Sequence, residues 1–365
     1  MAQATTQNPL NARLAYLNAA VKRSQEIPAQ AYTAGGANNF TFPHAGVGRF
    51  ARISFSGTLS RTEGATVGTA TASPFYPFNI ISNVILTDYT GTTRVNAKPY
   101  HLYLRELGMK FGFDPSATPI NAGYSTSVWA ASIPTGTINT TTTAPCVFSF
   151  EVPIALHRNT TEGSLPFNIP DGDTTLQIQM NALTGGTIDY PFAVTGGTSL
   201  TLSGTWQVTY YYYDAPANTP LPMMDFSLIH ELVSVRQNTN ISAGAEKQFV
   251  LETGRTYYQL IHMLVANNAP DTLDVQRVKF LIDGNTPTMD EFLLTYLSRA
   301  RETYGRDMPL GAFFFNFFVK PWSPASYGSL ATSLLLSSGI NLGTNYWLDT
   351  LKETQYFAKS ALTAA

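Results

Sequence analysis

Charged residues and cysteine are both scarce in this chain of 365 residues. Lys, Arg, Asp and Glu make up 13% of it, against about 25% in a typical globular domain, and the net charge is only −2. Because no basic run occurs, a surface that neutralises many phosphates is disfavoured, and we expect no direct specific binding of nucleic acid. The single cysteine, Cys146, excludes an internal disulfide and a multi-cysteine metal site, and its apolar neighbours Val147 and Phe148 predict a buried thiol.

Long apolar runs are also missing. No stretch of 18 or more apolar residues occurs, so no membrane-spanning helix is expected. The N-terminus lacks the continuous apolar core of a secretory signal. We therefore expect the protein to be made in the cytoplasm.

Motifs that carry catalysis are absent from the sequence. The five histidines never occur at the spacing of a local zinc site, and no complete phosphate-binding loop, dinucleotide fingerprint or nucleophile elbow is present. His262 lies in an apolar run and is predicted to be a core histidine. We predict that the chain is not an enzyme and uses no cofactor or metal.

Acidic residues leave two other possibilities open. The carboxylates of Asp171 and Asp173 could hold Ca²⁺, although Pro170 and Gly172 favour a simple turn. Glycoside hydrolysis needs two carboxylates at one cleft, and the sequence does not place any two of its candidates together. Those candidates are Glu106, Asp114, Glu151 and Glu162.

Strand-like patterns fill the chain from about residue 40. Apolar and polar residues alternate over 51–59, 175–180 and 205–212, which indicates strands with one buried face. Residues 83–89 and 260–266 are apolar throughout, so both faces of these strands should be covered. Many short strands separated by turn residues predict an all-β protein built from sandwiches or barrels.

The first 30 residues have a different pattern. Asn8 and Pro9 suit the start of a helix, and Pro28 closes the segment. Between them, four apolar residues fall on one face at helical spacing. These are Leu10, Leu14, Leu17 and Val21.

Basic residues accompany this apolar stripe. Arg13, Lys22 and Arg23 outnumber the one acidic residue, Glu26. We predict an amphipathic helix that packs against the body or a neighbour, with a position near a membrane surface as the alternative.

A proline-rich segment divides the remainder. Three prolines between Pro216 and Pro222 follow the tyrosine-rich strand that ends at Tyr213, and they cannot continue a central strand. A chain of this length also favours two domains. We predict a helical arm at 1–35, a first β-domain at 36–215, a linker at 216–224, and a second β-domain with a C-terminal tail at 225–365.

The two halves share one order of elements. In the first, an apolar strand ends at Asp88, a helix covers 100–107, and a Phe-x-Phe strand begins at Phe148. In the second, the corresponding strand ends at Asp283 and the Phe-x-Phe strand begins at Phe315. The repeat predicts that both halves are versions of one fold.

Two further predictions come from this repeat. In the second half, Thr288 and Glu291 form a capping box, which predicts a helix from Met289. In the first half, the connection at 109–145 is much longer and ends in a run of threonines, so we predict an exposed functional loop there.

Taken in order, these features resemble the double jelly-roll major capsid proteins of tectivirus-type bacteriophages, which contain an internal membrane. The resemblance rests on the N-terminal helix, the strand Trp206–Tyr213, the proline linker, residues 256–260, the helix from Met289, and the strand at 309–314. It covers essentially the whole chain. It implies two tandem eight-stranded jelly rolls, each with one inserted short helix.

The resemblance also implies a role. Such proteins form trimers with a pseudo-six-fold footprint, which tile an icosahedral shell over an internal lipid membrane and meet neighbouring trimers and penton or minor capsid proteins. The implied location is the virion, after synthesis in the host cytoplasm. Residues 109–145 would form an outward tower.

The same resemblance makes the N-terminal segment a candidate for membrane-proximal or inner-face contacts. The residues concerned are Arg13, Lys22 and Arg23, with the apolar Leu10, Leu14, Leu17 and Val21. The alternative is a β-sandwich carbohydrate-binding protein or glycosidase.

Overall fold

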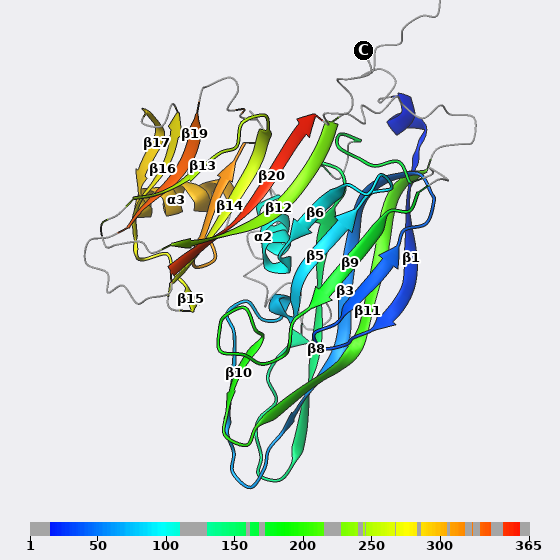
Figure 1. The fold of residues 1–365 in the computed structure, drawn as a ribbon, viewed down its shortest axis with the longest axis vertical. Helices are drawn as coiled ribbons and strands as arrows, with labels where there is room; N and C mark the ends of the chain where they lie inside the picture. The colour runs from blue at the N-terminus through cyan, green and yellow to red at the C-terminus, as the bar shows by residue number, and fades with distance from the viewer. Residues whose placement is uncertain are drawn as a thin grey trace, which may run out of the picture.

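The computed structural model describes most of the chain, and most of the described residues lie in β-strands (Figure 1). The described ranges are 15–109, 130–157, 161–167, 172–214, 228–239, 246–266, 268–282, 286–304, 307–317, 329–336 and 346–357, with the single residues 244 and 323. No helix among these ranges is long and apolar enough to cross a membrane.

The first half forms a two-layer roll. A five-stranded sheet with the order β1-β11-β3-β8-β7 packs its apolar face against strands β6, β5, β9 and β2. The strands of the whole first roll are β1 (Val21–Ala31), β2 (Ala37–Thr41), β3 (Val47–Thr62), β4 (Thr69–Ala72), β5 (Ile81–Thr87), β6 (Thr93–Ala97), β7 (Ala130–Ala131), β8 (Thr141–Pro153), β9 (Thr175–Met180), β10 (Phe192–Thr195) and β11 (Ser199–Asp214). Its helices are η1 (Phe78–Ile80) and α2 (Pro99–Met109).

The second half repeats this plan on a smaller scale. A four-stranded sheet with the order β13-β19-β16-β17 packs against strands β18, β14, β20 and β12. Its strands are β12 (Leu228–Thr239), β13 (Glu246–Val250), β14 (Thr256–Ala266), β15 (Ala269–Pro270), β16 (Val275–Ile282), β17 (Thr286–Phe292), β18 (Ala312–Asn316), β19 (Leu330–Leu336) and β20 (Tyr346–Phe357), and its helix is α3 (Leu293–Tyr304). The chain is therefore a tandem of two jelly rolls, each with one inserted helix, as the sequence predicts.

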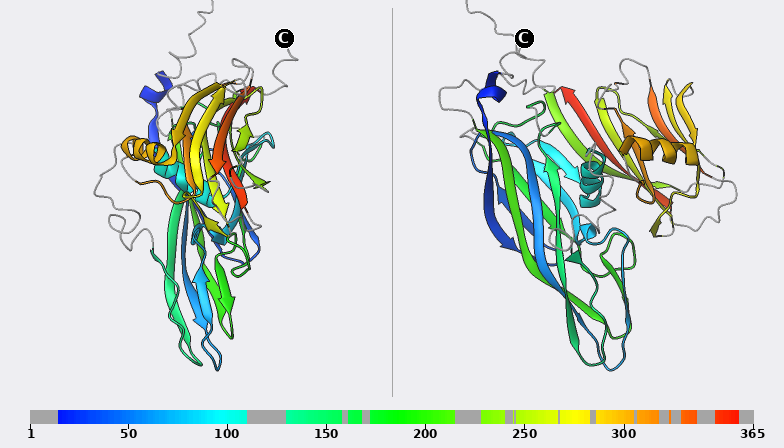
Figure 2. Two further views of the ribbon diagram at one scale, coloured as in Figure 1. Left: turned by 90° about the vertical axis from the view of Figure 1, so that its left-hand side faces the viewer. Right: turned by 180° about the vertical axis from the view of Figure 1, so that it is seen from behind.

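One sheet runs through both rolls. Strand β12 of the second roll pairs in parallel with β6 of the first, through Leu232 opposite Val95 and Val233 opposite Asn96. The resulting nine-stranded sheet links the two sandwiches side by side (Figures 1 and 2).

The sequence predicts that two strands of this long sheet, β5 and β14, are covered on both faces. Strand β14 is buried at every position after Thr256, because one face lies in the second core and the other packs towards helix α2. Strand β5 instead alternates, with Val84 and Leu86 buried and Asn83 and Ile85 only partly covered. The prediction of two covered faces is confirmed for β14 and wrong for β5.

The core of the first roll is built around one close contact between strands. Gly57 of β3 lies opposite Gly204 of β11, and the Phe55 ring occupies the space above both. A Cβ added at Gly204 would lie 2.6 Å from Phe55 Cζ and 2.6 Å from the carbonyl oxygen of Ser56. The Phe55 ring is in turn 4.5 Å from the fully buried Trp206, so it has little freedom to retreat.

We expect Gly204→Ala to lower the free energy of unfolding by about 1–3 kcal/mol, since overpacking a filled core forces side chains and backbone to shift. Urea denaturation measures the change. Gly186→Ala is the matched control, because no atom lies within 4 Å of the added methyl group. Equal midpoints for the two variants would contradict this account of the core.

A long finger extends from the first roll, away from the second (Figures 1 and 2). It consists of the far ends of β3, β8 and β11, with the two-stranded ribbon of β4 and β10. A buried ion pair holds its loops: Arg61 Nε donates to Glu63 at 2.5 Å, and Glu63 also accepts from Thr198 Oγ1 at 2.8 Å. Arg61 further donates to the carbonyl oxygen of Pro134 at 3.3 Å.

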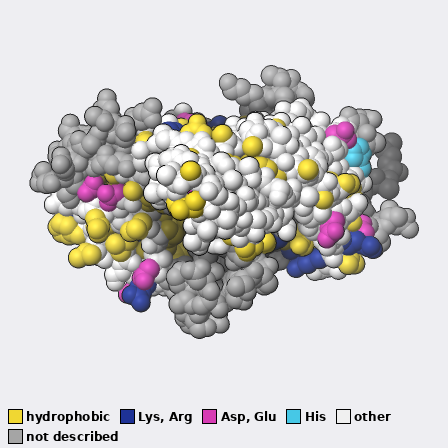
Figure 3. All heavy atoms as spheres, turned by 90° about the horizontal axis from the view of Figure 1, so that it is seen from below, with side chains coloured by type: hydrophobic (Ala, Val, Ile, Leu, Met, Phe, Trp, Pro, Cys, Tyr) yellow, Lys and Arg dark blue, Asp and Glu magenta, His cyan; other side chains and the backbone are white. Residues whose placement is uncertain are grey.

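This finger contains the described part of the loop predicted at 109–145. Residues 110–129 lie outside the described residues, whereas 130–145 form β7, one loop of the finger and the start of β8. Viewed from below, this end of the molecule carries mostly uncharged side chains (Figure 3).

The predicted N-terminal helix is wrong in extent. Within the described part of the predicted arm, only residues 15–19 are helical, and Val21–Ala31 forms strand β1. The reason is tertiary: β11 offers β1 a continuous ladder from Val21 opposite Asp214 to Ile27 opposite Val208. Residues 1–14, with Asn8 and Pro9, lie outside the described part.

The predicted start of the second helix is also wrong. Met289 and Glu291 belong to strand β17, and α3 begins at Leu293. Thr288 does not cap a helix, because its hydroxyl donates to the carbonyl oxygen of Phe280 in the neighbouring strand β16 at 3.0 Å. Each half thus has a strand, a second strand and then a helix, where the sequence suggested a strand followed directly by a helix.

Two smaller predictions are confirmed. Cys146 is fully buried, and burial raises the pKa of its thiol to about 11. His262 lies in the second core, where its ring nitrogens bond the hydroxyl groups of Thr350 and Thr332 at 2.7 Å each. The proline linker at 216–224 lies outside the described residues.

Candidate functional site at the junction between the two rolls

Helix α2 lies between the two rolls, next to the β6–β12 pairing that joins their sheets (Figure 1). It begins at Pro99, a residue whose fixed φ angle and missing N–H suit the first helical position. Next to this start, the backbone N–H of Lys98 donates to the Ser234 hydroxyl at 3.0 Å, and Nδ1 of His101 bonds the same hydroxyl at 2.8 Å. The beginning of the helix is therefore attached to strand β12.

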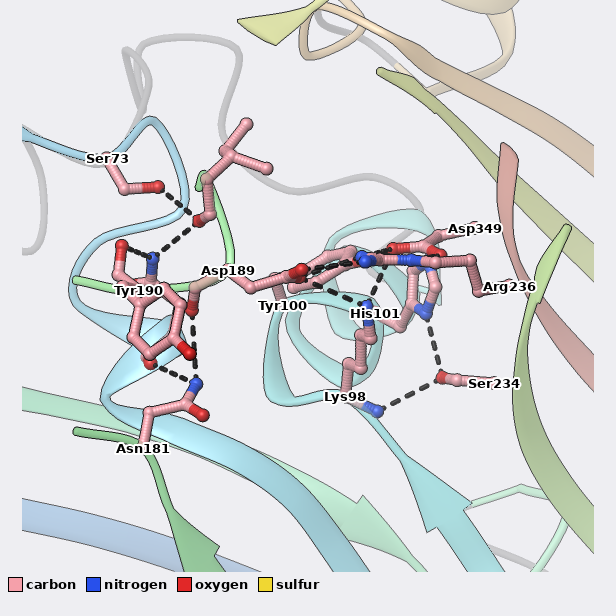
Figure 4. A network of polar contacts seen from close by, with 12 residues as sticks. Ser73, Lys98, Tyr100, His101, Asn181, Asp189, Tyr190, Ser234, Arg236 and Asp349 are labelled. Atoms are coloured by element: carbon pink, nitrogen blue, oxygen red, sulfur yellow. Dashed lines mark hydrogen bonds and ion pairs between the residues drawn. The ribbon is translucent and has the colours of Figure 1, made fainter. Parts of the chain in front are cut away.

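A first ionic cluster gathers around Asp349 of β20 (Figure 4). Its carboxylate accepts from Tyr100 Oη at 2.5 Å, from Lys98 Nζ at 2.8 Å and from Arg236 through two nitrogens at 2.7 Å each. Arg236 also donates to both oxygens of Asp189 at 2.6 and 2.7 Å. Side chains from two segments of the first roll thus enclose an ion pair of the second.

Burial and charge act in opposite directions in this cluster. Burial alone would raise the pKa of Asp349, but Arg236 and Lys98 outweigh it and hold that pKa well below its usual value. Burial also lowers the pKa of His101 to about 3, so its ring is neutral at pH 7. Asp349 is therefore ionised at neutral pH, and both of its carboxylate oxygens accept hydrogen bonds.

A second ionic cluster lies one turn further along α2. Arg105 donates from Nε and Nη2 to the two oxygens of Glu353 at 2.7 and 2.6 Å, a bidentate pair. His230 Nε2 bonds the same carboxylate at 2.9 Å, and Arg105 also donates to the Leu156 carbonyl oxygen at 3.2 Å. Burial alone would raise the pKa of Glu353. The charges and hydrogen bonds of Arg105 and His230 outweigh burial and lower that pKa to about 2.

This junction fixes the relative position of the rolls. Buried ion pairs add little net stability, because desolvation offsets their attraction, but they tolerate few alternative geometries. Two such clusters at one helix, together with the β6–β12 pairing, bridge the two rolls.

The candidate catalytic carboxylates do not form an open site. Glu106 and Glu151 both approach Arg52, at 3.2 and 3.8 Å, but their side chains are only 7% and 5% exposed. A sugar chain cannot reach carboxylates at that depth. Asp114 lies outside the described residues, and Glu162 is not brought to this pair by any ion pair or hydrogen bond of the described chain.

The proposed cation turn is likewise replaced by a pairwise contact. Asp173 bonds His44 Nε2 at 2.8 Å, and Asp171 lies outside the described residues. Within the described ranges, no three His, Cys, Asp or Glu side chains gather as metal ligands would.

The N-terminal candidate contacts fall into three groups. Leu10, Arg13 and Leu14 lie outside the described residues. Leu17 packs on a small apolar cluster formed by Tyr16, Val47 and Tyr213 at the end of the first roll.

The remaining three candidates begin strand β1. Val21 is 57% exposed, and Lys22 and Arg23 are exposed as well. Arg23 Nε lies 2.7 Å from the Asp214 carboxylate. The apolar stripe of the predicted helix therefore does not persist past residue 20.

Sequence reasoning missed the junction, although a signal was present. In a chain with 13% charged residues, Arg236, Asp349 and Glu353 stand inside two strands that carry several charged residues. Charges in the middle of strands indicate pairing across an interface, since an unpaired buried charge is costly.

Comparison with known proteins identifies solved structures that share this fold. No family model and no curated protein matches the chain. Among solved structures, it is similar to the MCP of STIV, the Sulfolobus turreted icosahedral virus, with a TM-score of 0.66 and 13% identity over 94% of this chain and 99% of that one.

Two other viral structures are similar along their whole length. The PBCV-1 virus capsid chain matches with a TM-score of 0.58 and 11% identity, over 92% of this chain and 94% of that one. The major capsid protein P2 of bacteriophage PM2 matches with a TM-score of 0.52 and 9% identity, over 93% and 98%. At these identities the likeness establishes the shared double jelly-roll fold.

Proposed function

We propose that this chain is the major capsid protein of a virus, with a structural and not an enzymatic role. One observation carries the proposal: two tandem rolls, joined by one sheet and two buried ionic clusters, match major capsid proteins over more than nine-tenths of each chain. A trimer with a pseudo-six-fold footprint needs two similar modules in each chain, held at a fixed spacing. The junction around α2 supplies that spacing.

In this proposal three copies assemble into a trimer whose six rolls give a pseudo-six-fold footprint. Trimers then meet neighbouring trimers, with penton or minor capsid proteins closing the icosahedral shell. The low charge of the chain supports such contacts, since each charge buried at an interface carries a desolvation cost. Copies made in the host cytoplasm would thus become part of the virion.

We further propose an inside and an outside for the subunit. The helical turn at 15–19 and the finger lie at opposite ends of the first roll (Figure 2). The N-terminal segment, with Arg13, Lys22 and Arg23 and the apolar Leu10, Leu14, Leu17 and Val21, would face the interior and an internal membrane. The finger would then point outward.

The domain limits form part of the same proposal. We place an arm at 1–35, the first roll at 36–215, a linker at 216–224 and the second roll at 225–365. Strand pairing within each half supports this division, although β1, at 21–31, pairs with the first roll.

A carbohydrate-binding protein or glycosidase is the less favoured function. The pair formed by Glu106 and Glu151 is buried against Arg52, which disfavours a hydrolytic site.

Light scattering of the purified full-length chain tests the proposal. We expect a stable species with three times the chain mass of 39.8 kDa. A strictly monomeric protein that binds glycans would overturn it.

A further inference from the structure

Strand β1 leaves one side of the first roll open. It pairs only with β11 among the described strands and forms one edge of the five-stranded sheet (Figures 1 and 2). Of its eleven residues, only Ile27 is buried. An edge of this kind is a template on which another strand can pair, and proteins usually block such edges.

Only the second half of this edge is blocked. Pro28 has no N–H to donate, and the pairing with β11 shifts between Ile27 and Gln30. The side chain of Asn38 then covers the edge, where it donates to Gln30 Oε1 at 2.9 Å and to the Ala31 carbonyl oxygen at 3.2 Å. The first half, residues 21–27, contains no proline, and its first six residues are exposed, while the Ile27 carbonyl oxygen accepts from Gln207 Nε2 at 2.7 Å.

The open half is complementary to itself in the antiparallel direction. If two copies pair about Ser24, Lys22 of one lies opposite Glu26 of the other, and the same contact occurs a second time by symmetry. Lys22, Ser24 and Glu26 share one face of the strand, because side chains alternate. On the other face, the exposed Val21 lies opposite Ile27, whose side chain is buried in the first core, so the charge pairs carry the complementarity.

No neighbouring register gives the same match. A shift by one residue places Lys22 opposite Gln25 or Ile27, which removes the charge pair and puts Val21 opposite a polar or proline residue. In the register about Ser24, Arg23 lies opposite the uncharged Gln25. This position leaves the ion pair of Arg23 with Asp214 of its own chain undisturbed.

We propose that residues 21–27 form a two-fold antiparallel contact with the same segment of a second copy, which joins two five-stranded sheets edge to edge. The occupant is a second copy because the sequence Val-Lys-Arg-Ser-Gln-Glu-Ile supplies its own complementary charges, as an isologous interface requires. The inference rests on the proposed function, in which many copies meet, and names one surface by which neighbouring subunits are joined.

The contact is short and therefore weak by itself. Seven residues contribute a few ladder hydrogen bonds and two exposed charge pairs, and exposed pairs contribute little each. Many such contacts acting together in a shell would nevertheless hold it firmly, while single subunits stay soluble. Pro28 limits the contact to this segment and prevents open-ended strand addition.

A cysteine at the two-fold axis tests the geometry. In Ser24→Cys, the two thiols face each other across the axis, where directly opposed Cβ atoms are about 4.5–5.5 Å apart. Mild oxidation or a short bismaleimide should link two chains covalently. The native Cys146 will not interfere, because it is fully buried. Ser298→Cys on the exposed side of α3 is the control and should not give the linked pair.

Charge variants in the Ser24→Cys background test the register. Lys22→Glu and Glu26→Lys each place like charges opposite one another twice, and we expect each to lower the yield of linked dimer about tenfold. The double variant Lys22→Glu/Glu26→Lys restores both pairs and should recover the yield. Arg301→Glu, a charge reversal at an exposed position of α3, should leave it unchanged.

The outcomes separate this inference from the proposed function. If the chain assembles but Ser24→Cys links no better than Ser298→Cys, the β1 contact is wrong and the coat role stands. If the double variant stays as low as the single ones, the register is wrong. A chain that remains monomeric under all conditions would overturn the proposed function itself.

Discussion

Replacement of Arg105 by methionine should lower the free energy of unfolding by about 3–5 kcal/mol, the cost of leaving a buried carboxylate without its main partner. Glu353 is fully buried and would keep only His230 as a partner for its charge. Methionine retains much of the volume of the arginine side chain, so lost packing contributes little. Urea denaturation followed by fluorescence measures the change.

Two matched variants make this result specific to the buried charge. Arg277→Met removes a similar ion pair whose members are 28% and 31% exposed, and it should cost no more than about 1 kcal/mol. Arg105→Met combined with Glu353→Gln removes both charges and should recover most of the loss, since a neutral side chain needs no counter-charge. Equal losses in the single and double variants would contradict the role of the pair.

Acidification should unfold the protein through buried groups of the junction and of the second core. As the pH falls, the buried histidines are protonated first and the buried carboxylate of Glu353 afterwards. Burial lowers the pKa of both His101 and His262 from 6.5 to about 3, so their stabilising effect is complete above pH 6.5 and is lost as the pH falls towards 3. The pKa of Glu353 is lowered from 4.5 to about 2, so its contribution is present above pH 4.5 and disappears towards pH 2.

We therefore expect the free energy of unfolding to be nearly constant between pH 7 and pH 8 and to fall by at least about 3 kcal/mol between pH 7 and pH 3. Denaturation curves at a series of pH values give this profile. In the Glu353→Gln variant, the part of the loss below pH 4.5 should be smaller, because the altered group no longer titrates. A profile that stays level down to pH 3 would show that these buried groups do not control stability.

Alternating strands could be predicted from the sequence because their signal is local. In β9, in β3 from Ala51 to Phe55 and in β11 from Trp206 to Tyr212, each second residue is apolar and buried, and the pattern gives both the strand and its inner face. The repeat of strand, turn, helix and Phe-x-Phe strand also reflects a real equivalence between the halves.

Helix limits failed where tertiary pairing overrides local preference. Thr288 and Glu291 fit a helix cap as well as any pair in the chain, yet β16 offers their segment a strand partner, and the helix begins later. Likewise, Val21 continues the apolar stripe of the N-terminal residues, but the ladder along β11 holds it in a strand.

The junction and the open edge could not be located from the sequence alone. Both depend on which segments distant in sequence lie side by side: Arg105 and Glu353 are 248 residues apart. The sequence shows only that charges occur in unusual places. The self-complementary order of residues 21–27 has meaning only once that segment is known to be an edge strand.

The central claim is that two rolls, held at one spacing by the α2 junction, act as a building block of a shell. Electron microscopy of the species with three times the chain mass tests it most directly. The account predicts a particle with a six-lobed outline, in which three fingers project from one face. A particle with three widely separated lobes, rolls at variable distances, or only single chains would contradict it.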